Sequence, residues 1–224
     1  MSQQIDVSLS HDDKDVRGDA SNMVALLTPV IKSFFTDNGV EITNDAIQVF
    51  GGYGYTKDQG IEQLFRDNRI TPIYEGTNSV QAIDLVYRKI LNNKIYNNYI
   101  AQITKEIQEY DKNKELTLFV QKFQKYVEIL NNFTSWLSEK NKNSKDDVSA
   151  ACNDYLKVLG YLGLAHSWLK ILKVSYEKYD TNKSFFEDKI NTATYYFDKI
   201  LPRAQSHYLS AITGSKSMMK ANFN

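Results

Sequence analysis

The sequence lacks the features that would point to several common classes of protein. Its 224 residues include one cysteine, Cys152, which excludes an internal disulfide framework. No apolar run is long enough to span a bilayer, and residues 1–19 are polar and acidic without an apolar signal-peptide core. Basic and acidic residues number 27 each, so no basic excess is left for nucleic acid. We therefore expect a protein of a reducing, cytoplasm-like compartment, without a membrane span or a nucleic-acid partner.

Glycine and proline are also scarce, with ten and three residues, which suits long helices joined by short links. Apolar residues recur at three- and four-residue steps, and no segment gives a convincing strand pattern. The predicted fold class is all-α, an antiparallel helical bundle followed by a second helical bundle. We expect a poorly ordered lead-in over 1–19, a helical domain over 20–94 and a helical extension over 95–224.

Helix boundaries follow from the spacing of apolar residues and from turn residues. Asn38 and Gly39 predict a helix stop, and Pro72 requires the chain to leave its helix before Glu75. Ser144 is a candidate N-cap. The first domain is expected to have helices over 20–37, 41–50 and 60–70 and one from about 76–78, and the extension to have helices over 113–139, 145–178 and 185–212.

One stretch, 46–88, holds five of the ten glycines and the most informative pair of residues, Glu75 and Gly76. This pair puts a carboxylate on an irregular link between two helical segments. Glycine allows a positive φ or a close approach of the backbone to a ligand, and Thr77 can cap the helix that follows. Taken alone, Glu75 would be interpreted as a carboxylate that merely complements a helix dipole.

Three motifs follow one another in this stretch: QVFGGYGY at 48–55, RDNRI at 66–70, and IYEGTN at 73–78 with Gln81. Together they resemble the C-terminal helical domain of the FAD-dependent acyl-CoA dehydrogenases. The likeness is strongest over 26–91. The rest of the chain loosely resembles the helical extension that follows this domain in the larger members of the family.

The resemblance implies a catalytic role for Glu75. In the family this position holds the base that removes a proton from the carbon next to the thioester carbonyl of an acyl-CoA substrate, while FAD accepts a hydride from the next carbon. Desolvation makes such a carboxylate more basic, and donors aimed at the thioester oxygen stabilise the developing enolate. In the family these donors are the backbone N–H of the base and a flavin hydroxyl. Gly76 matches a position that lines the acyl chain.

The resemblance also implies contacts with FAD. The element formed by Gln48, Gly51 and Gly52 reaches, in the family, across a subunit interface to the FAD of a neighbour. Without the resemblance it would be an ordinary helix stop with a turn. Thr77 and Ser79 fall where family residues approach the flavin or its pyrophosphate.

The other polar residues predict no further site. We expect Arg66, Asp67 and Arg69 to pair locally, with a CoA contact as the alternative. His166 lies in an apolar stripe and is expected to be a hydrogen-bonded core residue. The histidines are scattered, so no metal site is predicted. Cys152 is expected to lie in the core.

The resemblance covers only the last part of the family's fold. The N-terminal helical domain and the central β-domain, which hold most of the flavin site, have no counterpart in these 224 residues. The chain would then be an excised piece, the product of a split or truncated gene, or a subunit completed by another chain. Uncovered apolar faces predict a homo-oligomer or a complementing N-terminal half. The alternatives to a catalytic segment are a non-catalytic helical association module and a non-functional remnant.

Overall fold

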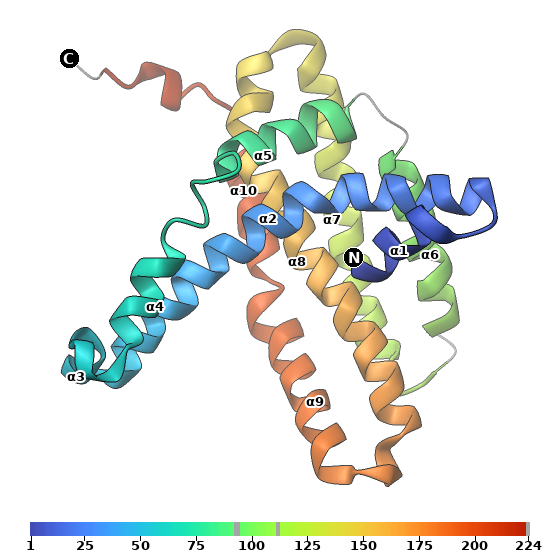
Figure 1. Ribbon diagram of the computed structural model, residues 1–224. Helices are drawn as coiled ribbons and strands as arrows, with labels where there is room; N and C mark the ends of the chain where they lie inside the picture. The colour runs from blue at the N-terminus through green and yellow to red at the C-terminus, as the bar shows by residue number, and fades with distance from the viewer. Residues whose placement is uncertain (92–94, 111–112, 223–224) are drawn as a thin grey trace. The chain divides into compact units, whose positions relative to one another are not determined.

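The computed structural model describes residues 1–91, 95–110 and 113–222 (Figure 1), and this part of the chain is helical without any strand. The prediction of an all-α fold is confirmed. The chain divides into two compact units, Met1–Lys89 and Ile90–Asn224. The expected domain boundary after residue 94 adjoins 92–94, which lie outside the described residues, and the observed division falls a few residues earlier.

The N-terminal unit is arranged around one long helix, α2, against which α1, α3, α4 and α5 pack. Figure 1 shows α4 running back along α2 from the end that carries α3. The elements are α1 (Ser2–Ser10), α2 (Lys14–Phe50), α3 (Gly52–Tyr55), η1 (Lys57–Gln59), α4 (Ile61–Asn68), α5 (Asn78–Asp84) and the π-helical turn η2 (Leu85–Ile90).

Helix α2 begins earlier than the sequence predicts. The side chain of Asp13 caps it by accepting hydrogen bonds from the N–H groups of Asp15 and Val16, at 2.7 and 3.3 Å. Residues 1–19 therefore contain α1 and the first turns of α2, where the sequence predicts a poorly ordered lead-in. One of the several charged residues behind that prediction, Asp13, is thus the N-cap of the helix.

Helix α2 also continues through Pro29 and through the stop predicted at Asn38 and Gly39, so the two helices expected over 20–50 are one. A Cβ atom at residue 39 would lie 2.6 Å from Nδ2 of Asn68 on α4. Gly39 therefore allows a close approach between two helices, a tertiary reason for glycine that a local pattern does not reveal.

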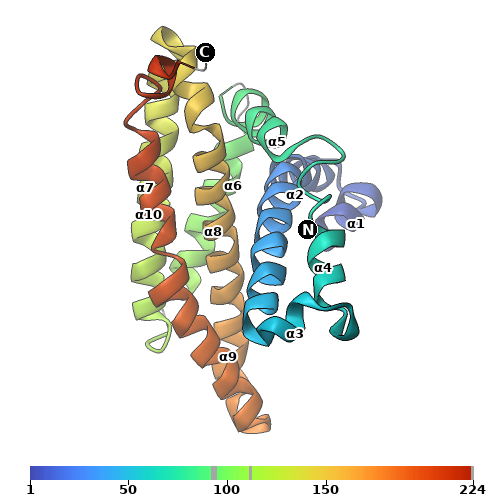
Figure 2. The ribbon, with the colours of Figure 1, turned by 90° about the vertical axis from the view of Figure 1, so that its left-hand side faces the viewer.

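The C-terminal unit is a bundle around α8, which packs against α7, α9 and α10 (Figure 2). As predicted, the side chain of Ser144 caps α8, and it accepts from the N–H of Asp147 at 3.3 Å. The helix expected over 185–212 is interrupted before Pro202. The elements are α6 (Ile95–Tyr110), α7 (Thr117–Asn143), α8 (Lys145–Glu177), η3 (Tyr179–Thr181), α9 (Lys183–Tyr195), the π-helical turn η4 (Tyr196–Ile200), α10 (Arg203–Ala211) and η5 (Met218–Lys220).

The core of this unit contains aromatic side chains among aliphatic ones. Phe133 makes edge-to-face contacts with Tyr155 and Tyr208, with ring centroids 5.1 and 5.4 Å apart. Cys152 is buried as predicted, and burial raises the pKa of its thiol to about 12. This thiol is a packing group and not a nucleophile.

The described residues lack two features. None of their helices has the length and apolar character needed to cross a membrane. Nor do their His, Cys, Asp and Glu side chains form a group of three or more that could hold a metal ion.

Candidate functional site

The link between α4 and α5 has an unusual backbone at the predicted site residues. Tyr74 still donates its N–H to the carbonyl of Ile70, at 3.2 Å. Glu75 and Gly76 then both have positive φ angles, 55° and 84°. Thr77 accepts from the N–H of Val80 at 3.4 Å and caps α5, as the sequence predicts.

Among the described residues, Glu75 is the one non-glycine residue with a positive φ. This left-handed conformation costs a residue with a Cβ atom about 1–2 kcal/mol. Such strain persists only where surrounding contacts hold it, and it is found often at functional sites.

Side chains donate hydrogen bonds to the backbone carbonyl groups of Glu75 and Gly76, which we call the strained pair. Nζ of Lys32, on α2, donates to the carbonyl oxygen of Gly76 at 2.7 Å and to Oδ1 of Asn78 at 2.8 Å. Nε2 of Gln81, on α5, donates to the carbonyl oxygen of Glu75 at 3.1 Å. We call Lys32 and Gln81 the carbonyl brace.

Asn78 fastens the start of α5 to α2 from the other side. Its Nδ2 donates to Oδ1 of Asp37 at 2.6 Å and to the carbonyl of Ser33 at 3.2 Å. In return, Oγ of Ser33 donates to the carbonyl of Asn78 at 3.0 Å. The segment after Glu75 is therefore tied to α2 through hydrogen bonds between residues more than 40 positions apart.

The functional groups of the strained pair are left open. The N–H groups of Glu75, Gly76 and Thr77 donate to none of the described residues. The carboxylate of Glu75 is exposed and forms no ion pair within the part of the chain that the structure describes. A carboxylate can remove a proton, and unpaired backbone N–H groups beside it can donate to an oxygen atom that gains negative charge.

The second predicted element, at the junction of α2 and α3, is a glycine turn. Gly51 ends α2 with φ 61° and ψ −144°, a conformation that is essentially restricted to glycine. A Cβ atom at Gly51 or Gly52 would meet nothing within 4 Å, whereas one at Gly54 would lie 2.7 Å from the carbonyl of Ile47. Gly54 therefore serves packing, and the backbone of Gly51 and Gly52 is open to a ligand, beside the exposed Gln48.

The structure brings some of the predicted residues together and separates others. Glu75, Gly76, Thr77 and Ser79 lie within one short link and the first turn of α5. The glycine turn lies at the other end of the unit, where Figure 1 shows α3 far from α5. Gln48 is sixteen positions beyond Lys32 on α2, which is about 24 Å along the helix axis.

Large apolar side chains are exposed around both elements. Val49 and Tyr55, beside the glycine turn, have 84% and 80% of their surface exposed. Exposed apolar side chains in such number are typical of interaction surfaces. The other exposed side chains of this kind between 35 and 83 are Phe35, Ile42, Phe50, Tyr53, Leu64, Ile70, Ile73, Tyr74, Val80 and Ile83.

The prediction of local ion pairs among Arg66, Asp67 and Arg69 is wrong. All three are exposed, and none forms an ion pair with another described residue. Asp67 instead lies 3.5 Å from Nε2 of Gln63, one helical turn earlier. Exposed pairs gain little energy from contact, so solvation competes with pairing here.

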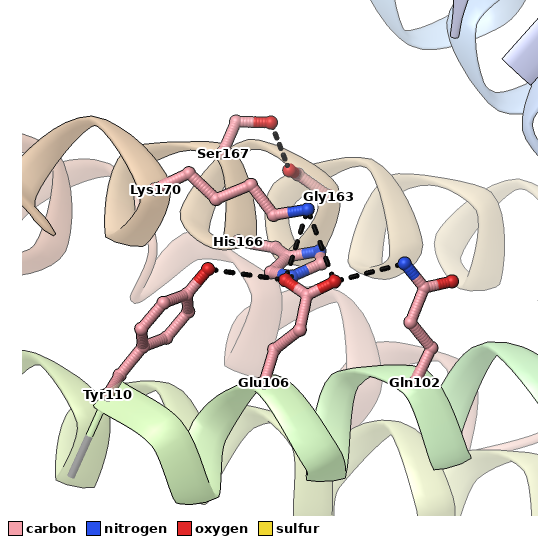
Figure 3. Close-up of polar contacts among 7 residues, drawn as sticks. All are labelled: Gln102, Glu106, Tyr110, Gly163, His166, Ser167 and Lys170. Atoms are coloured by element: carbon pink, nitrogen blue, oxygen red, sulfur yellow. Dashed lines mark hydrogen bonds and ion pairs between the residues drawn. The ribbon is translucent and has the colours of Figure 1, made fainter. Parts of the chain in front are cut away.

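A polar cluster in the C-terminal unit confirms the prediction for His166 (Figure 3). Its Nε2 lies 2.7 Å from Oε2 of Glu106, which also faces Lys170, Gln102 and the hydroxyl of Tyr110. Burial favours the neutral acid, but the hydrogen bonds from His166, Gln102 and Lys170 outweigh it and hold the pKa of Glu106 well below its ordinary value. All these groups are mutually satisfied, so the cluster is a structural link between α6 and α8.

Sequence reasoning missed Lys32 and gave Asn78 no structural role. One signal for Lys32 is present: it is the single charged residue between 20 and 36. A lone cation in an apolar helical segment indicates a specific acceptor, but it does not say that the acceptor is a carbonyl 44 positions away.

Each of the two units matches a protein-family model. Residues 14–91 match the model described as "Acyl-CoA dehydrogenase, C-terminal domain", and residues 99–222 match "Acetyl-CoA dehydrogenase C-terminal like". A curated relative, 3-methylmercaptopropionyl-CoA dehydrogenase of Ruegeria pomeroyi, is 42% identical over 81 residues, which are 36% of this chain and 14% of that protein. The chain thus spans a small part of the length of the relative.

Solved structures show the same fold. Caenorhabditis elegans ACDH-11 in complex with C11-CoA aligns with a TM-score of 0.76 at 19% identity, over 100% of this chain and 37% of that one. Bacillus anthracis acyl-CoA dehydrogenase complexed with FAD aligns with a TM-score of 0.68 at 14% identity, over 97% of this chain and 39% of that one.

Proposed function

The chain belongs to the acyl-CoA dehydrogenase family, and we propose that it is the C-terminal segment of a flavin-dependent acyl-CoA dehydrogenase in which Glu75 is the base. The observation that carries the proposal is the braced link at Glu75, with a positive φ, an exposed carboxylate and unpaired N–H groups.

In the proposed reaction Glu75 takes a proton from the carbon next to the thioester carbonyl. The N–H of Glu75, which donates to no other described residue, is available to the carbonyl oxygen of the thioester as negative charge develops there. Gly76 would line the acyl chain. Because Glu75 is exposed in this chain, the desolvation that strengthens a carboxylate as a base must come from covering polypeptide.

FAD is the cofactor that the family implies, and it would supply the acceptor for the hydride from the neighbouring carbon. The open backbone of Gly51 and Gly52, with Gln48 beside it, fits a ligand that approaches the main chain closely. As in the family, the glycine turn would reach the FAD of a neighbouring subunit. Thr77 and Ser79, on the separate link before α5, would approach the flavin or its pyrophosphate. Since this chain spans little of the length of its relatives, we expect no activity until a complementing polypeptide completes the flavin site.

A chimera tests the proposal. The full chain would be joined behind the segment of the Ruegeria pomeroyi relative that precedes its matched region, and assayed with FAD, 3-methylmercaptopropionyl-CoA and an electron-accepting dye. We expect a flavin that stays bound through gel filtration and dye reduction that depends on the thioester. Glu75→Gln should lower kcat by about a thousandfold while the flavin stays bound.

The matched control is Glu62→Gln, which changes a carboxylate on α4 within the same unit and should leave kcat unchanged. If the chimera with Glu75→Gln kept the full kcat, Glu75 would not be the base. If the chimera folded but neither bound FAD nor oxidised the thioester, the catalytic proposal for this chain would fail.

The second candidate function is a non-catalytic association module, which the exposed apolar side chains between 35 and 83 favour. This function requires the chain to bind a second copy or an acyl-CoA dehydrogenase segment without forming a flavin site. Sedimentation that shows a monomer at all concentrations, with and without the Ruegeria segment, would exclude it.

A further inference from the structure

We propose that Lys32 is a positioning residue that, together with Gln81, holds the carbonyl groups of the two successive residues Glu75 and Gly76. This inference rests on the proposed function of Glu75. Without such contacts, a non-glycine residue would return from a φ of 55° to an ordinary negative value. That change would rotate the neighbouring peptide groups and move the carboxylate.

The geometry of the brace restricts the peptide at both ends. The ammonium of Lys32 lies 2.7 Å from the Gly76 carbonyl, and the amide of Gln81 lies 3.1 Å from the Glu75 carbonyl. Because both carbonyl oxygens are engaged by the chain, the carboxylate of Glu75 and the N–H groups of Glu75 and Gly76 are left for substrate. The ammonium is itself fixed by Oδ1 of Asn78, whose amide is held in turn by Asp37.

Glycine at position 76 is part of the same arrangement. Its φ is 84°, and a Cβ atom there would lie 3.2 Å from Nε2 of Gln81. A side chain at 76 would therefore press on the donor that holds the Glu75 carbonyl. The brace thus explains in physical terms why this acid is followed by glycine.

Proteolysis of the full chain tests the brace without any requirement for activity. The rate at which a Glu-specific protease cleaves after Glu75 reports the fraction of molecules in which the link between α4 and α5 is locally unfolded. The rate of cleavage after Glu115 is the internal reference. Lys32→Met, which keeps length but removes the donor, should raise the rate at Glu75 by about three- to tenfold, and Gln81→Leu should raise it similarly. Lys32→Arg should restore slow cleavage, and the matched control Lys57→Met should have no effect.

The chimera distinguishes a positioning role from a structural one. There, Lys32→Met should lower kcat by about tenfold or more while KM stays within about twofold, and Lys32→Arg should recover most of kcat. Unchanged cleavage after Glu75 in both Lys32→Met and Gln81→Leu would overturn the brace. Faster cleavage with an unchanged kcat would overturn the positioning role. Full activity of Glu75→Gln would instead refute the proposed function, and the cleavage result would still decide whether the brace exists.

Discussion

Nε2 of His166 lies 2.7 Å from Oε2 of Glu106, and this contact joins α8 to α6 inside the C-terminal unit (Figure 3). Nζ of Lys170 lies 3.0 Å from the same oxygen. One carboxylate therefore serves two partners on α8, and few other contacts link these two helices. The stability of α6 should depend on the charge of Glu106.

Glu106→Gln should destabilise the C-terminal unit by about 2 kcal/mol at neutral pH, because it removes the charged acceptor of His166 and Lys170. The folded-state pKa of Glu106 is below its ordinary value of 4.5, so the unfolded state binds more protons in acid. The stabilisation is fully present above about pH 4.5 and is lost as pH falls below that value.

Urea unfolding followed by tryptophan fluorescence measures this effect, because Trp136 and Trp168 both lie in the C-terminal unit. The difference between wild type and Glu106→Gln should shrink as pH is lowered from 6 to 3, a range chosen to bracket the ordinary pKa. Glu109→Gln changes an exposed carboxylate on the same helix and should show little difference at any pH. A constant difference between wild type and Glu106→Gln over this range would contradict the prediction.

The positive φ of Glu75 predicts an unusual response to glycine. Glu75→Gly relieves about 1–2 kcal/mol of backbone strain and costs about 0.5–1 kcal/mol of chain entropy. The N-terminal unit should therefore keep or slightly gain stability, whereas Glu62→Gly within α4 should lose about 1 kcal/mol. Amide hydrogen exchange of α2, measured as a function of urea concentration, gives the stability of the N-terminal unit in each variant. An equal loss of stability in Glu75→Gly and Glu62→Gly would argue against strain at Glu75.

Two glycines of the C-terminal unit should respond to alanine in opposite directions. Gly214 has a φ of 77°, and a Cβ atom there would lie 2.9 Å from Oδ1 of Asp147, so Gly214→Ala should cost about 1–2 kcal/mol. A Cβ atom at Gly163, within α8, would meet nothing within 4 Å, so Gly163→Ala should add about 0.5–1 kcal/mol. Thermal unfolding of both variants checks the signs, and a loss in Gly163→Ala would show a contact that the structure does not contain.

The exposed apolar surface of the N-terminal unit predicts self-association of the isolated chain. Val49→Asp places a charge where 84% of the side chain is exposed, and it should shift sedimentation towards monomer without lowering the melting temperature. Leu118→Asp is the matched control in the other unit, with 58% exposed. Equal sedimentation of wild type and Val49→Asp at every concentration would show that the surface around Val49, beside the glycine turn, does not mediate association.

Local signals in the sequence were sufficient where one side chain decides the backbone. Thr77 and Ser144 cap α5 and α8 as predicted, because an N-cap needs only its own oxygen and an N–H three positions later. The apolar periodicity likewise gave the fold class, since a buried stripe is a property of each helix alone.

The sequence was insufficient where the reason lies in a distant segment. The local pattern at Gly39 predicts the end of a helix. In the structure Gly39 instead allows Asn68 of α4 to pack closely against α2, and the pattern of a single helix carries no information about that contact. The link at Glu75 has a positive φ, and the carbonyl of the next residue accepts a hydrogen bond from Lys32, 44 positions before Gly76, a coupling that no short motif contains. The roles of the predicted site residues stay predictions, which the chimera and its variants address.

The unbroken course of α2 makes the length of one segment critical. An insertion of a single residue between Asp37 and Gln48 would advance everything beyond it by about 1.5 Å and turn it by about 100°. The glycine turn would then point away from its present direction, and the packing of α4 against α2, where Gly39 faces Asn68, would be lost. The number of residues in α2 therefore fixes the direction in which the glycine turn faces relative to Glu75, and the proposed function depends on that number as well as on the carboxylate.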